Sequence, residues 1–212
     1  MTNEGHDRHQ LSAMATRAQE AMDTDTLIAL ADRGYYKGEE LLACEQAGIT
    51  PLVPKPLTSN SKAKGRFDKR DFRYEADHDS YQCPAGERAP RRMSTIEDGM
   101  TIHVYWSSAC PACPLRSQCT TGRYRRIRRW KHESTLEALQ SKLDGRPDAM
   151  RVRRQTVEHM FGTLKFWMGA THFLTQILPK VATEMSLHVL AYNMKRVMKI
   201  MGVRPLMQAI MA

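Results

Sequence analysis

The sequence has 212 residues, enough for one domain or one domain with an insertion, and its 42% hydrophobic residues are enough to build a core, so disorder is not the expectation. A formal net charge of +9 favours a polyanionic partner, either nucleic acid or an acidic membrane surface. No apolar run approaches the ~18 residues of a membrane span and the first residues lack a signal-peptide pattern, so we expect a cytoplasmic protein with no membrane partner.

The first part of the sequence, residues 1–56, has the pattern of a strand–helix–strand unit. Residues 10–22 predict a helix, residues 27–31 an apolar strand, residues 37–48 a second helix and residues 49–56 a second strand. This spacing implies parallel strands joined by a crossover helix. Asp32 follows the first strand, where functional groups of parallel sheets collect. It is a candidate metal ligand, and a turn or capping role is the alternative.

Residues 57–122 predict an insertion that carries four of the five cysteines. In a reducing compartment clustered cysteines indicate metal rather than disulfides. Cys110 and Cys113 form a close pair, Cys119 follows, and Cys83 lies upstream, so the four thiols could hold a tetrahedral structural zinc. Unligated thiols are the alternative. Cys44 lies on the predicted helix and is expected to be a buried small hydrophobe.

Residues 123–212 predict a basic helical part. From Arg123 to Arg154 there are 11 basic and 4 acidic residues, an excess that indicates a phosphate-binding stripe. Aromatic residues among the arginines could stack on exposed bases. A cationic surface without a partner is the alternative. The candidate DNA-binding residues of this stripe are Arg125, Arg126, Arg128, Arg129, Trp130 and Lys131.

The stretch RRQTVEHMFGTLK, residues 153–165, places one glutamate between cations. Glu158 lies four residues after Arg154 and seven before Lys165, so at ~3.6 residues per turn the three side chains share a helix face. Nearby cations keep a carboxylate ionised, which suits a metal ligand or a phosphate-handling site. For this helix taken alone, an ordinary surface ion pair is the more common interpretation. Together with Asp32, Glu158 could hold magnesium for phosphodiester cleavage.

The last segment has apolar residues at helical spacing, which predicts a helix. The expected role of this Met-rich stripe is core packing rather than ligand binding. The residues of the stripe are Val181, Met185, Leu190, Met194, Val197 and Met201.

Several stretches, taken in this order, resemble the DDE transposases of bacterial insertion sequences, in the branch with a cysteine-containing insertion. These are TNEGHDRHQLSAM, ADRGYY, YQCPAGE, CPACPLRSQCT, RRIRRWKHE, RRQTVEHMFGTLKFWMGATHFL and EMSLHVLAYNMKRV. The resemblance implies an α/β ribonuclease H-like core. In that core three acidic residues bind two magnesium ions, and the enzyme cuts and rejoins double-stranded DNA at the ends of the element. Asp32 matches the second acidic residue and Glu158 the third.

The resemblance also gives roles to the cations around Glu158. A signature of Tyr, two residues, Arg, three residues, Glu, six residues, Lys is kept by Arg154, Glu158 and Lys165, whereas Arg151 stands at the tyrosine position. Lys165 would hold a DNA phosphate beside the metals, and Arg154 would orient Glu158 or meet the DNA backbone.

One acidic residue of the family has no counterpart in the sequence. The first aspartate lies upstream of the stretch that matches here, and Asp7 matches a later position. We therefore expect the C-terminal part of a transposase, inactive alone, with a homo-oligomer or a separate N-terminal half as partner. A regulatory zinc-containing DNA-binding fragment, or a small zinc protein that binds RNA, are the alternative functions.

Overall fold

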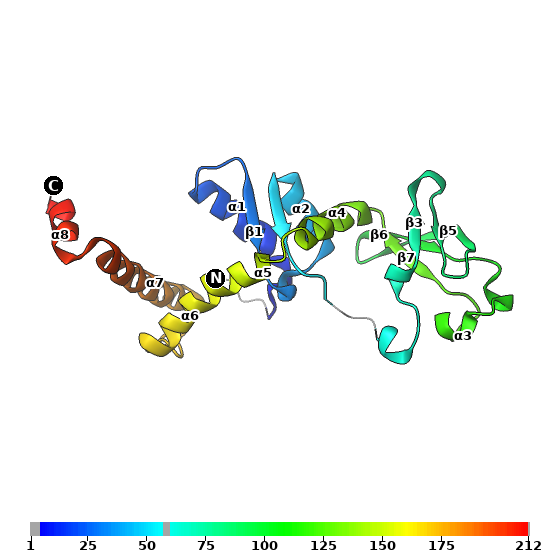
Figure 1. Cartoon of the computed structure of the whole chain (residues 1–212). Helices are drawn as coiled ribbons and strands as arrows, with labels where there is room; N and C mark the ends of the chain where they lie inside the picture. The colour runs from blue at the N-terminus through cyan, green and yellow to red at the C-terminus, as the bar shows by residue number, and fades with distance from the viewer. Residues whose placement is uncertain (1–4, 57–59, 212) are drawn as a thin grey trace.

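The computed structural model describes residues 5–56 and 60–211. Figure 1 shows three parts along the molecule. A strand–helix–strand unit lies in the middle, an antiparallel sheet lies at one end, and two helices, α7 and α8, extend from the other end.

The middle part confirms the predicted unit at residues 10–56. After η1 (Asp7–His9) come α1 (Leu11–Ala21), β1 (Leu27–Leu30), η2 (Arg33–Tyr35), α2 (Gly38–Gln46) and β2 (Ile49–Leu52). β1 and β2 are parallel, with Leu27 opposite Ile49. Gly48 ends the crossover at φ +74°, a conformation that a side chain would strain.

The core of this unit lies between the strands and three helices. Leu41 and Ile49 are almost fully buried, and Leu139 reaches the same cluster from α4. Cys44 is completely buried in this core, as predicted for a small hydrophobe. Burial raises the pKa of its thiol to about 11.

The antiparallel sheet has five strands in chain order. It contains β3 (Arg73–Glu75), β4 (Ser80–Gln82), β5 (Arg88–Glu97), β6 (Met100–Tyr105) and β7 (Ile127–Trp130). The short elements around it are η3 (Lys62–Lys64), η4 (Lys69–Asp71), η5 (Ala76–His78), η6 (Cys110–Ala112) and α3 (Arg116–Cys119). Asp98 and Gly99 form the β5–β6 turn, both at positive φ, which a two-residue hairpin favours.

The basic stretch forms β7 at the edge of this sheet, so the prediction of helix from Arg123 is wrong for Ile127–Trp130. Ile127 pairs with Tyr105 and Trp130 with Ile102 across the ladder with β6. These partners lie more than 20 residues upstream in sequence. Long-range pairing of this kind overrides local propensity.

The helical part begins directly after β7. It comprises α4 (Glu133–Asp144), α5 (Ala149–Arg153), the π-helix η7 (Arg154–Glu158), α6 (His159–Gly162), the π-helix η8 (Thr163–Trp167), α7 (Leu178–Met201) and α8 (Val203–Met211). Glu133 at the start of α4 is buried and joins the sheet to this part. It accepts hydrogen bonds from Lys69 Nζ at 2.7 Å and from the backbone N–H of Trp130 at 3.2 Å.

The predicted core role of the Met-rich stripe is wrong. α7 is helical as expected, but Leu190, Met194 and Met201 remain 55%, 52% and 47% exposed. The only buried residue of the helix is Tyr192. Figure 1 shows the reason, because α7 extends away from both sheets. Within the described ranges, no helix is both long enough and apolar enough to cross a membrane.

Candidate active site

Asp32 lies two residues after the end of β1 and caps the start of η2. Its Oδ1 accepts a hydrogen bond from the backbone N–H of Gly34 at 2.9 Å, the capping role that the sequence left open. A Cβ on Gly34 would lie 3.0 Å from that same oxygen, so glycine permits the close turn. The side chain is 51% exposed. The cap therefore fixes one oxygen and leaves the carboxylate accessible to solvent.

Asp32 and Glu158 meet through one arginine. Arg153 donates from Nη2 to Asp32 Oδ2 at 2.9 Å and from Nη1 to Glu158 Oε1 at 3.3 Å. The contact joins residues 121 positions apart and brings the helix of Glu158 to the carboxyl end of β1. Carboxylate oxygens are the ligands that Mg²⁺ prefers, but here Arg153 is the cation that bridges the two side chains.

The arginine that contacts Glu158 is Arg153, whereas the sequence pointed to Arg154. Residues Arg154–Glu158 form a π-helix, in which backbone hydrogen bonds join residues i and i+5. This wider turn places Arg153, five residues before Glu158, on the face of the carboxylate. Arg154 is exposed and has no ion-pair partner among the described residues. Only a five-residue spacing, which an α-helical reading ignores, could have identified Arg153.

Tyr35 lies beside this group of charges. The pKa of its phenol is raised, mainly by burial and also by the negative charges of Asp7 and Asp32, while Arg153 lowers it. Asp7 is thus in electrostatic range of the same tyrosine. In the part of the chain that the structure describes, however, no three acidic, His or Cys side chains are arranged to hold a metal ion.

Three of the predicted DNA-binding residues are engaged inside the fold. Arg129 is buried, bonds Glu137 from Nη2 at 2.9 Å and lies 3.7 Å above the ring of Tyr74. Trp130 is buried in the cluster that joins the sheet to α2 and α4. Arg125 donates to the carbonyl of Phe67 at 3.2 Å. These three side chains therefore make contacts within the protein and are not part of the DNA interface proposed below.

The other predicted cations remain accessible. Arg126, Lys131, Arg154 and Lys165 are exposed, and Arg128 is exposed with an ion pair to Glu97. Strand alternation explains the division, since Arg128 and Arg129 point to opposite faces of the sheet.

The four cysteines of the insertion approach one another from three segments. Cys83 follows β4, Cys110 begins η6, Cys113 follows η6, and Cys119 ends α3. All four are half-buried free thiols. Burial raises the pKa of Cys119, the nearby Arg125 lowers it, and the other three thiols add to the rise. The thiols are thus neighbours, although their present positions do not form a metal-ligand group in the described residues.

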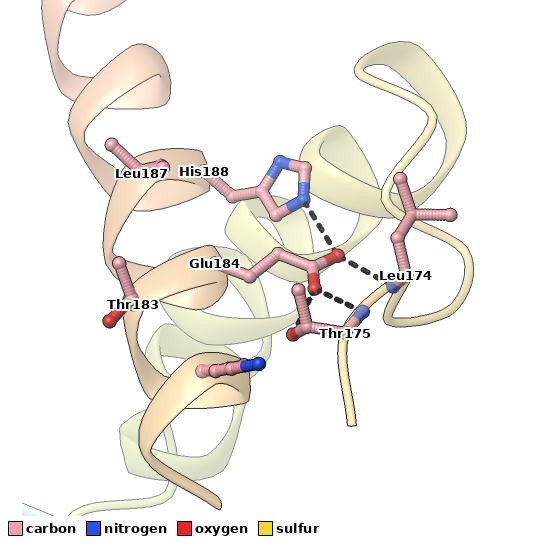
Figure 2. Close-up of a pocket in the computed structure, with 7 residues that line it drawn as sticks. Leu174, Thr175, Thr183, Glu184, Leu187 and His188 are labelled. Atoms are coloured by element: carbon pink, nitrogen blue, oxygen red, sulfur yellow. Dashed lines mark hydrogen bonds and ion pairs between the residues drawn. The ribbon is translucent and has the colours of Figure 1, made fainter. Parts of the chain in front are cut away.

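A cavity of about 470 Å³ lies between α7 and the loop before it (Figure 2). Glu184 on α7 accepts hydrogen bonds from the backbone N–H groups of Leu174 and Thr175, both at 2.9 Å, and from the Thr175 hydroxyl at 2.7 Å. His188 approaches it at 3.9 Å. The bond from Leu174 contributes most to lowering the pKa of Glu184. Glu184 therefore anchors the loop to the helix.

The site brings together Asp32, at the carboxyl end of β1, and Glu158, on the helical segment that follows α4. That helical segment also carries the exposed cations Arg154 and Lys165. Exposed cations of this kind can contact phosphate groups, although no metal-ligand group is arranged among the described residues. A family model described as Transposase DDE domain matches residues 82–198, which is more than half of the chain, and the chain belongs to this family of transposases. Transposases of this family bind DNA and generally use a divalent metal such as magnesium. Neither the curated proteins nor the solved structures contain a match to the chain.

Proposed function

We propose that this transposase chain supplies two metal ligands of a magnesium-dependent DNA cleavage and strand-transfer site, Asp32 and Glu158. The observation that carries the proposal is that both carboxylates contact Arg153, which lies 121 positions after Asp32 in the sequence. Bound magnesium would activate the attacking oxygen and stabilise the leaving oxygen of a phosphodiester. The ribonuclease H-like core implied by the resemblance would place both carboxylates around that metal.

The exposed cations supply the DNA contacts in this proposal. Lys165 and Arg154 lie on the helical segment of Glu158, and Arg126 and Lys131 flank β7. Each can neutralise a phosphate without entering the protein core. Double-stranded ends of an insertion sequence are the proposed partner.

We further propose that this chain does not cut DNA alone. Two carboxylates converge in the described residues, whereas the reaction implied by the resemblance uses three. The purified chain, incubated with an element-end duplex and magnesium, should leave the DNA intact. Coexpression with an N-terminal transposase half should restore cleavage. A defined cut made by the chain by itself would overturn this part of the proposal.

A regulator that occupies element ends is the second candidate function. The observation behind it is the five-stranded sheet, whose strands pair with one another within this chain, as an independently folding binding module requires. Cooperative thermal unfolding, together with tighter binding to element ends than to random duplex, would support regulation. Aggregation on purification, or equal affinity for both duplexes, would count against it.

Replacing Lys165 by Ala should weaken duplex DNA binding and flatten its salt dependence by about one counterion. The reason is that Lys165 is exposed and has no ion-pair partner among the described side chains, so its charge is free for phosphate. The measurement is affinity against log salt concentration. Lys142→Ala on α4 removes the same charge away from the proposed interface and should keep the wild-type slope. An unchanged slope for Lys165→Ala would remove this residue from the interface.

We also propose that Cys83, Cys110, Cys113 and Cys119 bind a structural zinc, supported by their convergence from three segments. Zinc would draw the thiols together as thiolates, and binding would release protons. Because the pKa of Cys119 is raised, zinc affinity should increase as the pH rises. Cobalt substitution should give a thiolate-to-cobalt absorption band that Cys119→Ser weakens and Cys44→Ala preserves. Absence of the band in the wild-type chain would refute the zinc site.

A further inference from the structure

Arg153 occupies the space between the two proposed metal ligands. Its two terminal nitrogens are divided, with Nη2 on Asp32 and Nη1 on Glu158. The arginine side chain is only 16% exposed, compared with 51% for Asp32 and 59% for Glu158. The guanidinium is therefore held between the carboxylates, which themselves face solvent.

Both carboxylate oxygens of Asp32 accept a hydrogen bond. Oδ1 accepts from the Gly34 N–H and Oδ2 accepts from Arg153. Magnesium binds carboxylate oxygens at about 2.0–2.1 Å, closer than either donor approaches. A dication at that distance would lie within a few ångströms of the guanidinium, where like charges repel strongly. Metal and arginine thus compete for the same oxygens.

We propose that Arg153 is a cationic placeholder that holds Asp32 and Glu158 together until a divalent metal displaces it. The planar fork of arginine suits this role, because two nitrogens can serve two separate carboxylates at once. The π-helix supports the role by turning residue 153 toward the carboxylate of residue 158. This inference rests on the proposed function, since it assumes that Asp32 and Glu158 bind metal.

Isothermal titration of the full chain with Mn²⁺ tests the competition directly. Arg153→Gln removes the competing charge and leaves a shorter, neutral polar side chain. It should tighten Mn²⁺ binding about three- to tenfold, as expected for loss of two partly exposed ion pairs. Arg151→Gln makes the same charge change on the same helix, where the side chain is exposed, and should alter affinity less than about twofold. Affinity of Arg153→Gln equal to or weaker than wild type would overturn the proposal.

A second measurement uses only the wild-type chain, so it does not depend on the folding of a variant. Titration with Mg²⁺, followed by NMR of arginine side chains, should shift the Arg153 guanidinium resonance and speed its exchange with water. An Arg153 resonance that stays unchanged while metal binds would also overturn the proposal.

The two proposals fail in distinguishable ways. If wild type binds Mn²⁺ through Asp32 and Glu158 but Arg153→Gln binds no more tightly, only the placeholder is refuted. If neither protein binds Mn²⁺, the metal site itself is refuted, and the placeholder with it. If only Arg153→Gln binds, the competition is stronger than expected and the placeholder is supported.

Discussion

Replacing Asp32 by Asn should lower the affinity of the chain for Mn²⁺ by about tenfold or more, because it removes one of two charged ligands. The fold should be preserved. Asparagine can also accept the Gly34 N–H bond at the start of η2, and the Asp32 side chain is half exposed. Calorimetry with Mn²⁺ measures the affinity, and thermal unfolding checks the fold.

A control for this variant lies at the other end of the same strand. Asp25→Asn makes the same charge change just before β1, at an exposed side chain. We expect it to leave Mn²⁺ affinity close to that of wild type. Glu158→Gln should reproduce the effect of Asp32→Asn. Equal Mn²⁺ affinities in wild type, Asp32→Asn, Asp25→Asn and Glu158→Gln would mean that the contacts of Arg153 with Asp32 and Glu158 are only surface ion pairs.

Replacing Arg129 by Ala should lower the free energy of unfolding by about 1–3 kcal/mol, the range for leaving a buried polar group without its partner. The Arg129 side chain is 7% exposed and covers the ring of Tyr74, while its ion-pair partner Glu137 is 52% exposed. Its loss leaves the buried Tyr81 hydroxyl without the bond that Arg129 Nη1 donates at 3.3 Å. Urea unfolding followed by tryptophan fluorescence measures the change.

The adjacent arginine provides the matched control. Arg128 is 56% exposed on the other face of β7, and its ion pair with Glu97 is a surface pair. Arg128→Ala should therefore cost no more than about 1 kcal/mol of unfolding free energy. A comparable loss in both variants would contradict the assignment of Arg129 to the core and of Arg128 to the surface.

Much of the middle part could be predicted from the sequence because its signals are local. Apolar residues of β1 end at Asp32, and Gly48 ends the crossover at positive φ. The parallel pairing of β1 with β2 then follows because the helix between them returns the chain to the end of the sheet where β1 began. The place of Asp32 at a strand end could be predicted for the same reason.

The basic stretch shows where local reasoning fails. Six cations in nine residues resemble a solvated surface, yet Arg129 and Trp130 are buried. Their burial depends on pairing with β6 and on packing against Tyr74 and α4, contacts that are distant in sequence. Helical periodicity likewise predicted α7 correctly but could not tell whether its apolar face meets a core.

The sequence by itself determined the family resemblance, the strand–helix–strand unit and the candidacy of Asp32 and Glu158. These depend on residue type and short-range spacing, which the chain carries without any folding partner. Only the tertiary structure decided that Arg153 rather than Arg154 joins the two carboxylates. A π-turn changes which residues share a helix face, and the contact that makes Arg153 the bridge is with Asp32, 121 positions away in sequence.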